Sequence, residues 1–133
     1  MISHGHYDHT GGLPAVLKMK GPVDVHGHNE MFARRIWSNG EITRDVGIPY
    51  RRNYLESLGA RFRLNTDMVE IGSGIYLTGE IPRKSTFEKD DANMTLISDD
   101  GHRVNPDPLL DDLSMIVETD RGLIIVLGCA HAG

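Results

Sequence analysis

Four potential metal ligands lie between positions 4 and 9 of the chain, in the sequence His-Gly-His-Tyr-Asp-His. They are His4, His6, Asp8 and His9, and residues 10–12 behind them read Thr-Gly-Gly. Imidazole nitrogen and carboxylate oxygen suit Zn²⁺, and also iron and manganese. At a strand end the i, i+2 spacing turns His4 and His6 to one side, so both can share one ion. Asp8 and His9, on the next bend, can face a second ion, as two-metal hydrolysis requires. The alternative is a solvated histidine-rich loop.

The pattern along the rest of the chain predicts alternating short helices and strands, in the order typical of an α/β layered fold with mixed sheets. Residues 38–50 are expected to form a loop that covers a site, and residues 83–108 an exposed excursion around one short strand. We expect helices at residues 13–20, 29–37 and 51–58, and strands at 1–3, 23–26, 61–64, 68–71, 75–81, 94–97, 113–118 and 123–127.

Composition restricts the class of protein. The 133 residues suit one domain, and 39% hydrophobic and 25% charged residues are near the averages for soluble globular proteins. The net charge of −5 argues against binding nucleic acid, which usually needs a basic face.

The single cysteine, Cys129, forms no intrachain disulfide and fits a reducing compartment. The aliphatic run at residues 123–127 is too short to cross a bilayer. We therefore expect a cytoplasmic protein that acts on a small molecule, with no indication of its oligomeric state.

The motif HxHxDH followed by two glycines at a strand-to-helix junction resembles the signature of the metallo-β-lactamase superfamily. Residues 78–83, Thr-Gly-Glu-Ile-Pro-Arg, and 127–133, Leu-Gly-Cys-Ala-His-Ala-Gly, resemble a narrower branch that includes proteins related to ribofuranosylaminobenzene 5′-phosphate synthase. This resemblance implies part of an αββα sandwich with mixed sheets. It also implies a metal-dependent hydrolase with two divalent ions, zinc in the first place and iron or manganese as alternatives.

The resemblance also implies a role for each ligand. His4, His6 and His131 would hold the first metal ion, and Asp8 and His9 the second. Asp8 would have a catalytic role as well, because the aspartate of such sites orients the attacking water or accepts its proton. The bond attacked would be an ester, lactone, amide or phosphoester of a small substrate.

Other candidate residues have competing interpretations. Cys129 is either a further thiolate ligand or a small buried thiol beneath the loop, and the second is favoured. His26 and His28 imitate the first motif without its acid, which favours surface or packing histidines. Glu80 and Arg83 flank a proline at a strand end and are candidates for a pocket wall, with Arg83 as an anion clamp, although solvated charges are favoured.

The superfamily pattern needs a motif before residue 4 and another histidine after residue 133. We therefore expect residues 1–133 to be a single incomplete domain with uncovered sheet edges, marginal stability and at most weak activity. Two further hypotheses stay open: a non-catalytic metal-binding or redox module, and an inactive truncated fragment. A nuclease-type member is disfavoured by the acidic charge.

Overall fold

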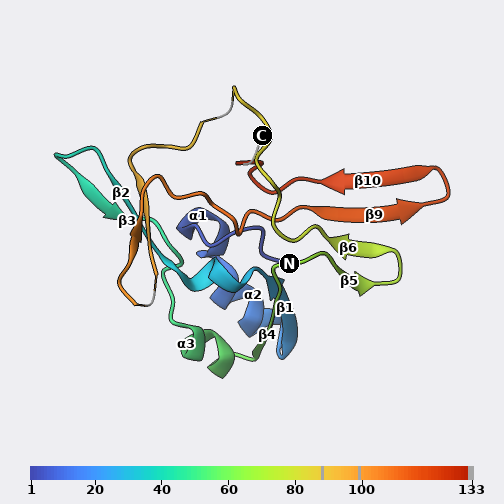
Figure 1. Ribbon diagram of the computed structural model, residues 1–133. Coiled ribbons are helices and arrows are strands. Elements are labelled where there is room, and N and C mark those ends of the chain that lie inside the picture. The colour runs from blue at the N-terminus through green and yellow to red at the C-terminus, as the bar shows by residue number, and fades with distance from the viewer. Residues whose placement is uncertain (88, 99, 132–133) are drawn as a thin grey trace.

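The computed structural model describes residues 1–87, 89–98 and 100–131. Its helices are short and lie before or between the strands in the chain order, as Figure 1 shows. The helices are α1 (Tyr7–Thr10), α2 (Leu13–Lys20), the 3₁₀ helix η1 (Asn29–Phe32) and α3 (Arg52–Ser57). The strands are β1 (Val23–Gly27), β2 (Arg34–Ser38), β3 (Thr43–Asp45), β4 (Ala60–Leu64), β5 (Val69–Gly72), β6 (Ile75–Leu77), β7 (Met94–Ile97), β8 (Arg103–Val104), β9 (Met115–Thr119) and β10 (Gly122–Val126).

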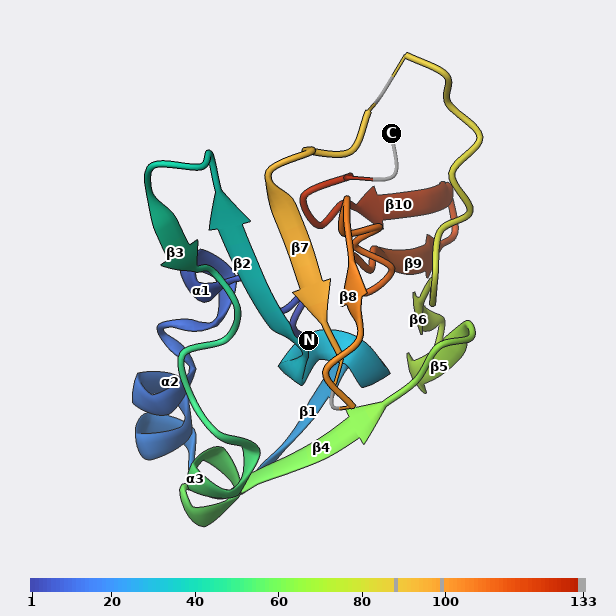
Figure 2. The ribbon, with the colours of Figure 1, turned by 60° about the vertical axis from the view of Figure 1, so that its left-hand side comes forward.

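The strands in the described part of the chain form three sheets. β1 and β4 pair in parallel, whereas the sheets β10-β9-β6-β5 and β3-β2-β7-β8 are antiparallel. Figure 2 shows the sheet of β2 and β7 standing beside α1, with β9 and β10 on its other side. The combination of helices with parallel and antiparallel strand pairs confirms the α/β prediction, although each described sheet is by itself purely parallel or purely antiparallel.

The hydrophobic core lies between the β1–β4 pair and the helices α2 and α3. Its buried members are Leu13, Leu17, Val25, Leu55 and Ala60. Helix α2 presents Leu13 and Leu17, one turn apart, to this core, as the 3.6-residue period requires. It ends at Gly21, whose φ of 77° is a conformation that glycine adopts without a Cβ penalty. The helix expected at residues 13–20 is therefore confirmed.

Tertiary pairing changes two of the predicted elements. The helix expected at residues 29–37 is wrong beyond position 32, since Arg34–Ser38 forms β2 between β3 and β7. β-prone Ile36 and Trp37 gain ladder partners there, and pairing overrides a weak helix pattern. The strand expected at residues 1–3 is also absent. Ile2 donates to the His26 carbonyl at 2.8 Å and Ser3 accepts from Leu113 at 2.9 Å, too few bonds for a ladder.

Two segments expected to be mainly irregular contain strands that the local pattern did not predict. Residues 38–50 include β3, which pairs with β2. Residues 83–108 contain the expected strand at 94–97, which is β7, and also the unexpected β8; most of the described residues of this segment are exposed or half-buried, as expected, although Leu96 of β7 is buried. Strands β3, β7 and β8 complete the sheet that contains β2, a strand that the local pattern also did not predict.

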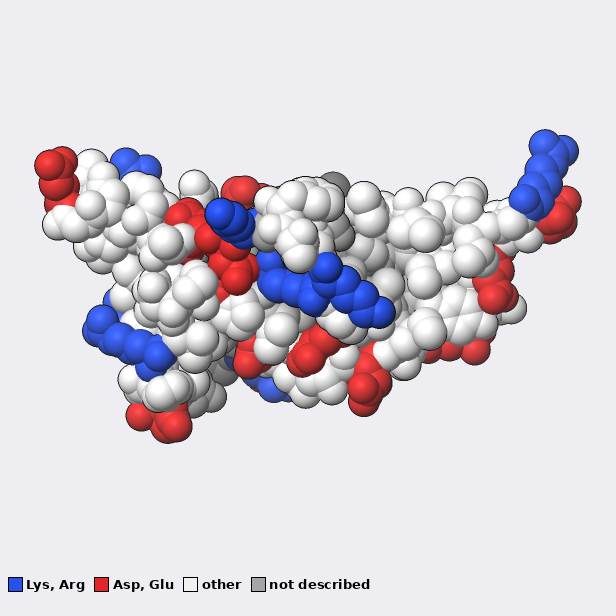
Figure 3. All heavy atoms as spheres, turned by 45° about the horizontal axis from the view of Figure 1, so that its top comes forward, with Lys and Arg blue, Asp and Glu red and all other residues white. Residues whose placement is uncertain are grey.

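The β9–β10 hairpin carries exposed apolar side chains. The side chains from Leu123 to Leu127 are 44–62% exposed, and β10 is at the edge of its sheet. Figure 3 shows the hairpin as a mostly uncharged arm with charges at its tip. This agrees with the expectation of uncovered apolar faces. Within the described ranges, the structure has no helix long and apolar enough to cross a membrane.

Candidate metal centre

Three histidines from opposite ends of the chain converge in the folded structure. Each of His4, His6 and His131 offers a ligand atom, and these atoms all lie within 4.8 Å of one another. His4 Nε2 is 3.0 Å from His6 Nδ1, and the His131 ring centroid is 5.2 Å from that of His4 and 5.7 Å from that of His6. The structure therefore brings together the three residues predicted to hold the first metal ion.

The state of these imidazoles fits a cation. The Nε2 atoms of His6 and His131 are buried and have no hydrogen-bond partner in the described chain. Burial, followed by the neighbouring histidines, lowers the pKa of His4 to about 3. Burial, followed by the positive charge of Arg35, lowers the pKa of His6 to about 4. Metals bind neutral imidazole, so two neutral rings and two unsatisfied nitrogens are what a metal centre needs.

A second group of potential ligands lies beside the first and shares His4 with it. Ligand atoms of His4, His9 and Cys129 all lie within 4.8 Å of one another. Cys129 Sγ is 3.1 Å from His9 Nε2, and Ser3 Oγ lies 3.1 Å from His4 Nδ1. The Cys129 thiol is thus exposed beside His9 instead of being buried beneath the loop. The thiolate interpretation has the geometry that it needs.

Asp8 lies outside both groups as the structure describes them. Its side chain is 61% exposed, and its Oδ2 is 3.6 Å from His9 Nε2. Helix α1 is a single turn that starts at Tyr7, and Asp8 is its second residue. The structure places Asp8 next to His9, as the motif predicts, but with its carboxylate directed to solvent.

A carboxylate that sequence reasoning missed holds the two ends of the site together. Asp112 Oδ2 accepts the backbone N–H of His131 at 2.7 Å, and Oδ1 accepts that of Cys129 at 3.0 Å. The same Oδ1 is 3.8 Å from His4 Nδ1, and Asp112 is buried. One side chain thereby fixes the loop that delivers His131 and lies against the ring of His4.

A buried ion network supports the turn between His4 and His6. Arg35 donates from Nε to Asp107 at 2.9 Å and from Nη2 to Asp111 at 2.8 Å, and all three side chains are buried. Asp111 then accepts the backbone N–H of Gly5 at 2.7 Å. A Cβ on Gly5 would collide with the Met31 carbonyl, so only glycine fits here. The one sequence signal is the acid pair at residues 111–112 between leucines, which suggests carboxylates in a buried setting.

Comparison with known proteins finds relatives that match the whole chain. No protein-family model matches the chain. It is 31% identical over its whole length to 7,8-dihydropterin-6-methyl-4-(β-D-ribofuranosyl)-aminobenzene-5′-phosphate synthase of Methanocaldococcus jannaschii, covering 46% of that protein. It is 29% identical to an uncharacterised protein of the same organism, covering 48% of it.

A solved structure described as a metal-dependent hydrolase of the β-lactamase superfamily superposes on 99% of the chain. The TM-score is 0.78 at 25% identity, over 46% of that protein. The chain has a metallo-β-lactamase fold. It spans about half the length of the curated relatives and of the solved structure that it matches. The resemblance inferred from the HxHxDH motif is confirmed by both comparisons.

Within this metallo-β-lactamase fold, the other candidate residues lie outside the two ligand groups. His28 is buried, accepts from the Glu30 N–H at 3.1 Å through Nδ1, and is 3.1 Å from Glu80 Oε1 through Nε2. It therefore caps η1, which agrees with a packing histidine. Arg83 donates to the His131 carbonyl at 2.6 Å, and with Glu80 it lines a pocket of about 530 Å³. Arg83 thus helps to hold the His131 loop of the metallo-β-lactamase fold.

Proposed function

We propose that the chain binds two divalent metal ions and contributes to a hydrolase that cleaves an ester, lactone, amide or phosphoester bond of a small substrate. The observation that carries this proposal is the convergence of His4, His6 and His131. These three residues would hold one ion, and Asp8 and His9 would hold the other. Zinc is the expected metal because imidazole nitrogen dominates the donor set, with iron or manganese as alternatives.

Metal ions at these positions would supply Lewis acidity and lower the pKa of water. The chain's own contribution is to hold the ligands and to manage a proton. Asp8 is exposed beside His9, so its carboxylate is free to orient a water molecule and accept its proton. Support also comes from the solved structure described as a metal-dependent hydrolase.

Metal analysis of freshly purified protein tests the proposal. We expect about two equivalents of metal per chain, as a binuclear site requires. His4→Ala combined with His6→Ala should abolish binding at the first position. His102→Ala is the matched control, because His102 is exposed and lies outside both ligand groups. Metal-free wild-type protein, or a double variant that keeps both equivalents of metal, would refute the proposal.

A second candidate function is metal binding without hydrolysis. It is favoured by the position of Cys129 beside His9 and by the outward direction of Asp8. Hydrolysis of generic phosphodiester and lactone substrates separates the two. The hydrolase proposal expects turnover by the metal-loaded wild-type protein, and loss of that turnover with Asp8→Asn. The second candidate expects no turnover in the metal-loaded protein and a loss of metal with Cys129→Ser.

A further inference from the structure

A cavity of about 920 Å³ lies next to the turn that carries His4 and His6, called the histidine turn below, and has an unusual wall. Its lining includes three arginines and three aromatic residues: Tyr7, Phe32, Arg34, Tyr50, Arg51 and Arg52. Among the described residues that line it, Asp45 is the only acid. In a chain with a net charge of −5, three arginines around one cavity are a local concentration of positive charge.

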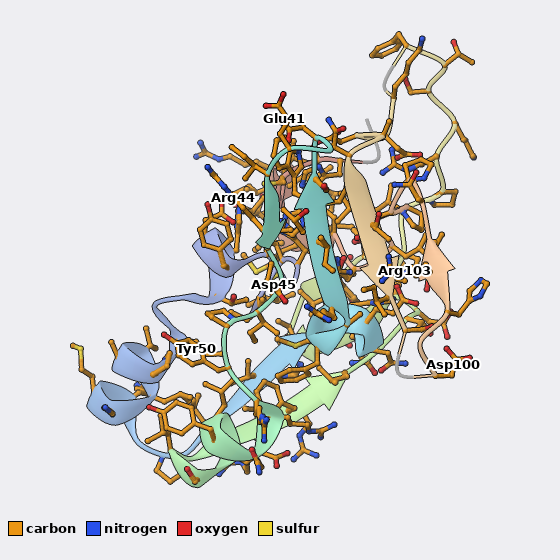
Figure 4. The ribbon with its side chains drawn as sticks, turned by 90° about the vertical axis from the view of Figure 1, so that its left-hand side faces the viewer. Glu41, Arg44, Asp45, Tyr50, Asp100 and Arg103 are labelled. Carbon is orange, nitrogen blue, oxygen red and sulfur yellow. The ribbon has the colours of Figure 1, made fainter. Side chains whose placement is uncertain are left out.

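The wall of the cavity is connected to both ends of helix α1, which carries Asp8 and His9. Tyr7, between His6 and Asp8, lines the cavity, and its backbone N–H donates to the Val46 carbonyl at 3.0 Å. At the other end of α1, Tyr50 donates from its hydroxyl to the Gly11 carbonyl at 2.9 Å. Figure 4 shows Asp45 and Tyr50 on the segment that runs from β3 past α1 to α3. Tyr7 directly follows His6 in the sequence, so the Cα atoms of these two residues are about 3.8 Å apart and the cavity wall begins beside His6.

Two of the three arginines in the cavity wall form ion pairs, and the third does not. Arg34 pairs with Asp45 at 3.0 Å, and Arg52 pairs with Glu56 at 2.8 Å. Arg51 has no side-chain partner among the residues that the structure describes. A guanidinium group presents a planar fork of donors that matches the oxygens of a phosphate or carboxylate. Arg51 therefore has its full set of donors available for an anion.

We propose that this cavity binds an oxyanion joined to an aromatic ring. Arg51 takes the oxyanion, and the rings of Tyr7, Tyr50 and Phe32 provide the aromatic wall on which the ligand ring packs. The assignment of this cavity as a binding site stands on its own lining. Its use as the substrate pocket rests on the proposed hydrolase function, because the reacting bond must reach the histidine turn.

The single tryptophan gives a direct measurement. Trp37 lines a smaller cavity of about 280 Å³ whose wall also includes Tyr7 and Asp45. Phenyl phosphate is titrated into chelator-treated protein, so that no turnover occurs, and Trp37 fluorescence is followed with excitation that avoids the ligand. Benzoate tests the other oxyanion, inorganic phosphate the anion alone, and phenol the ring alone. We expect phenyl phosphate or benzoate to bind more tightly than both phenol and inorganic phosphate.

The decisive variant is Arg51→Gln, which removes a charge without breaking an ion pair that the structure describes. We expect binding of the aryl oxyanion to weaken roughly tenfold or more, the effect of a lost charge-assisted hydrogen bond. Arg103→Gln is the control, because Arg103 is also exposed on the surface but lies outside the cavity. Equal affinities of the two variants, or aryl oxyanions that bind no better than phenol, would overturn the proposal.

The same titration distinguishes this proposal from the hydrolase proposal. If the chain binds metal but no aryl oxyanion, the cavity proposal is overturned and the metal centre stands. If the aryl oxyanion binds to a chain that takes up no metal, the cavity is confirmed as a binding site while the hydrolase function fails.

Discussion

The carboxylate of Asp112 accepts the backbone N–H of His131 at 2.7 Å, across a sequence separation of 19 residues. The hydrogen bond connects a buried acid before β9 to the loop after β10. The His131 loop lies beyond the edge strand β10, and Arg83 also holds it by donating to the His131 carbonyl. Asp112 and Arg83 therefore together hold the third histidine close to His4 and His6.

Asp112→Ala should lower the affinity for metal more than it lowers the stability of the folded protein. Residues that orient metal ligands commonly contribute about 10- to 100-fold to metal affinity, and we expect a loss of zinc affinity in that range. Isothermal titration with zinc measures it. Asp112→Asn should be intermediate, since its amide oxygen still accepts one N–H. Asp120→Ala at the exposed hairpin turn is the control, and an affinity for Asp112→Ala equal to that of this control would contradict the role assigned.

Gly5→Ala should destabilise the protein strongly. The new Cβ would collide with the Met31 carbonyl and lie 2.9 Å from Arg35 Nη1, so the backbone of the turn or the buried arginine must move. We expect a loss of about 1–3 kcal/mol of unfolding free energy or more. Gly12→Ala is the matched control: its Cβ meets nothing within 4 Å, and its effect should stay within about 0.5 kcal/mol. Chemical denaturation of both variants checks this, and equal midpoints would refute it.

Arg35→Met should cost far more stability than the same change at the neighbouring residue. Burial already raises the pKa of Asp111, and Arg35 opposes that effect. Removing a buried partner leaves uncompensated charge, at a cost of about 3–5 kcal/mol. Arg34→Met breaks only the exposed pair with Asp45 and should cost about 0–1 kcal/mol. Urea denaturation of the two variants measures the difference, which should be absent if the buried network contributes nothing.

The metal-free protein should become less stable as the pH falls below about 6.5. The pKa values of His4 and His6 are lowered to about 3 and about 4, so the unfolded chain takes up protons that the folded chain does not. The stabilisation is fully present above the ordinary histidine pKa and is lost as the pH falls towards the folded values. The slope should approach about two protons, ~1.4 kcal/mol per pH unit for each.

Urea denaturation in chelator between pH 7 and pH 4 measures this slope. His6→Gln, which cannot take up a proton at this position, should remove about half of it, whereas His102→Ala should leave it unchanged. A stability that does not vary over this range, or one that rises on acidification, would show that the two rings are not held neutral by burial.

The local pattern predicted the elements that depend on short-range order. Helix α2 followed from its apolar period and its glycine stop, and β9 and β10 followed from two apolar runs around a turn. The pattern failed at β2, whose strand conformation depends on pairing with β3 and β7. It also missed β3 and β8, which are short strands stabilised by their partners in that same sheet.

By itself the sequence determined which side chains are candidate metal ligands, because imidazoles and a carboxylate at this spacing suit only a few metal ions. Only the tertiary structure decided which of these groups meet. It brought His131 to His4 and His6 over more than a hundred residues, placed Cys129 beside His9, and left Asp8 at the surface. It also buried Asp111 and Asp112, whose role depends on backbone N–H groups distant in sequence. The physical reason is that a ligand's type is a property of one side chain, whereas its approach to another ligand is a property of the packed chain.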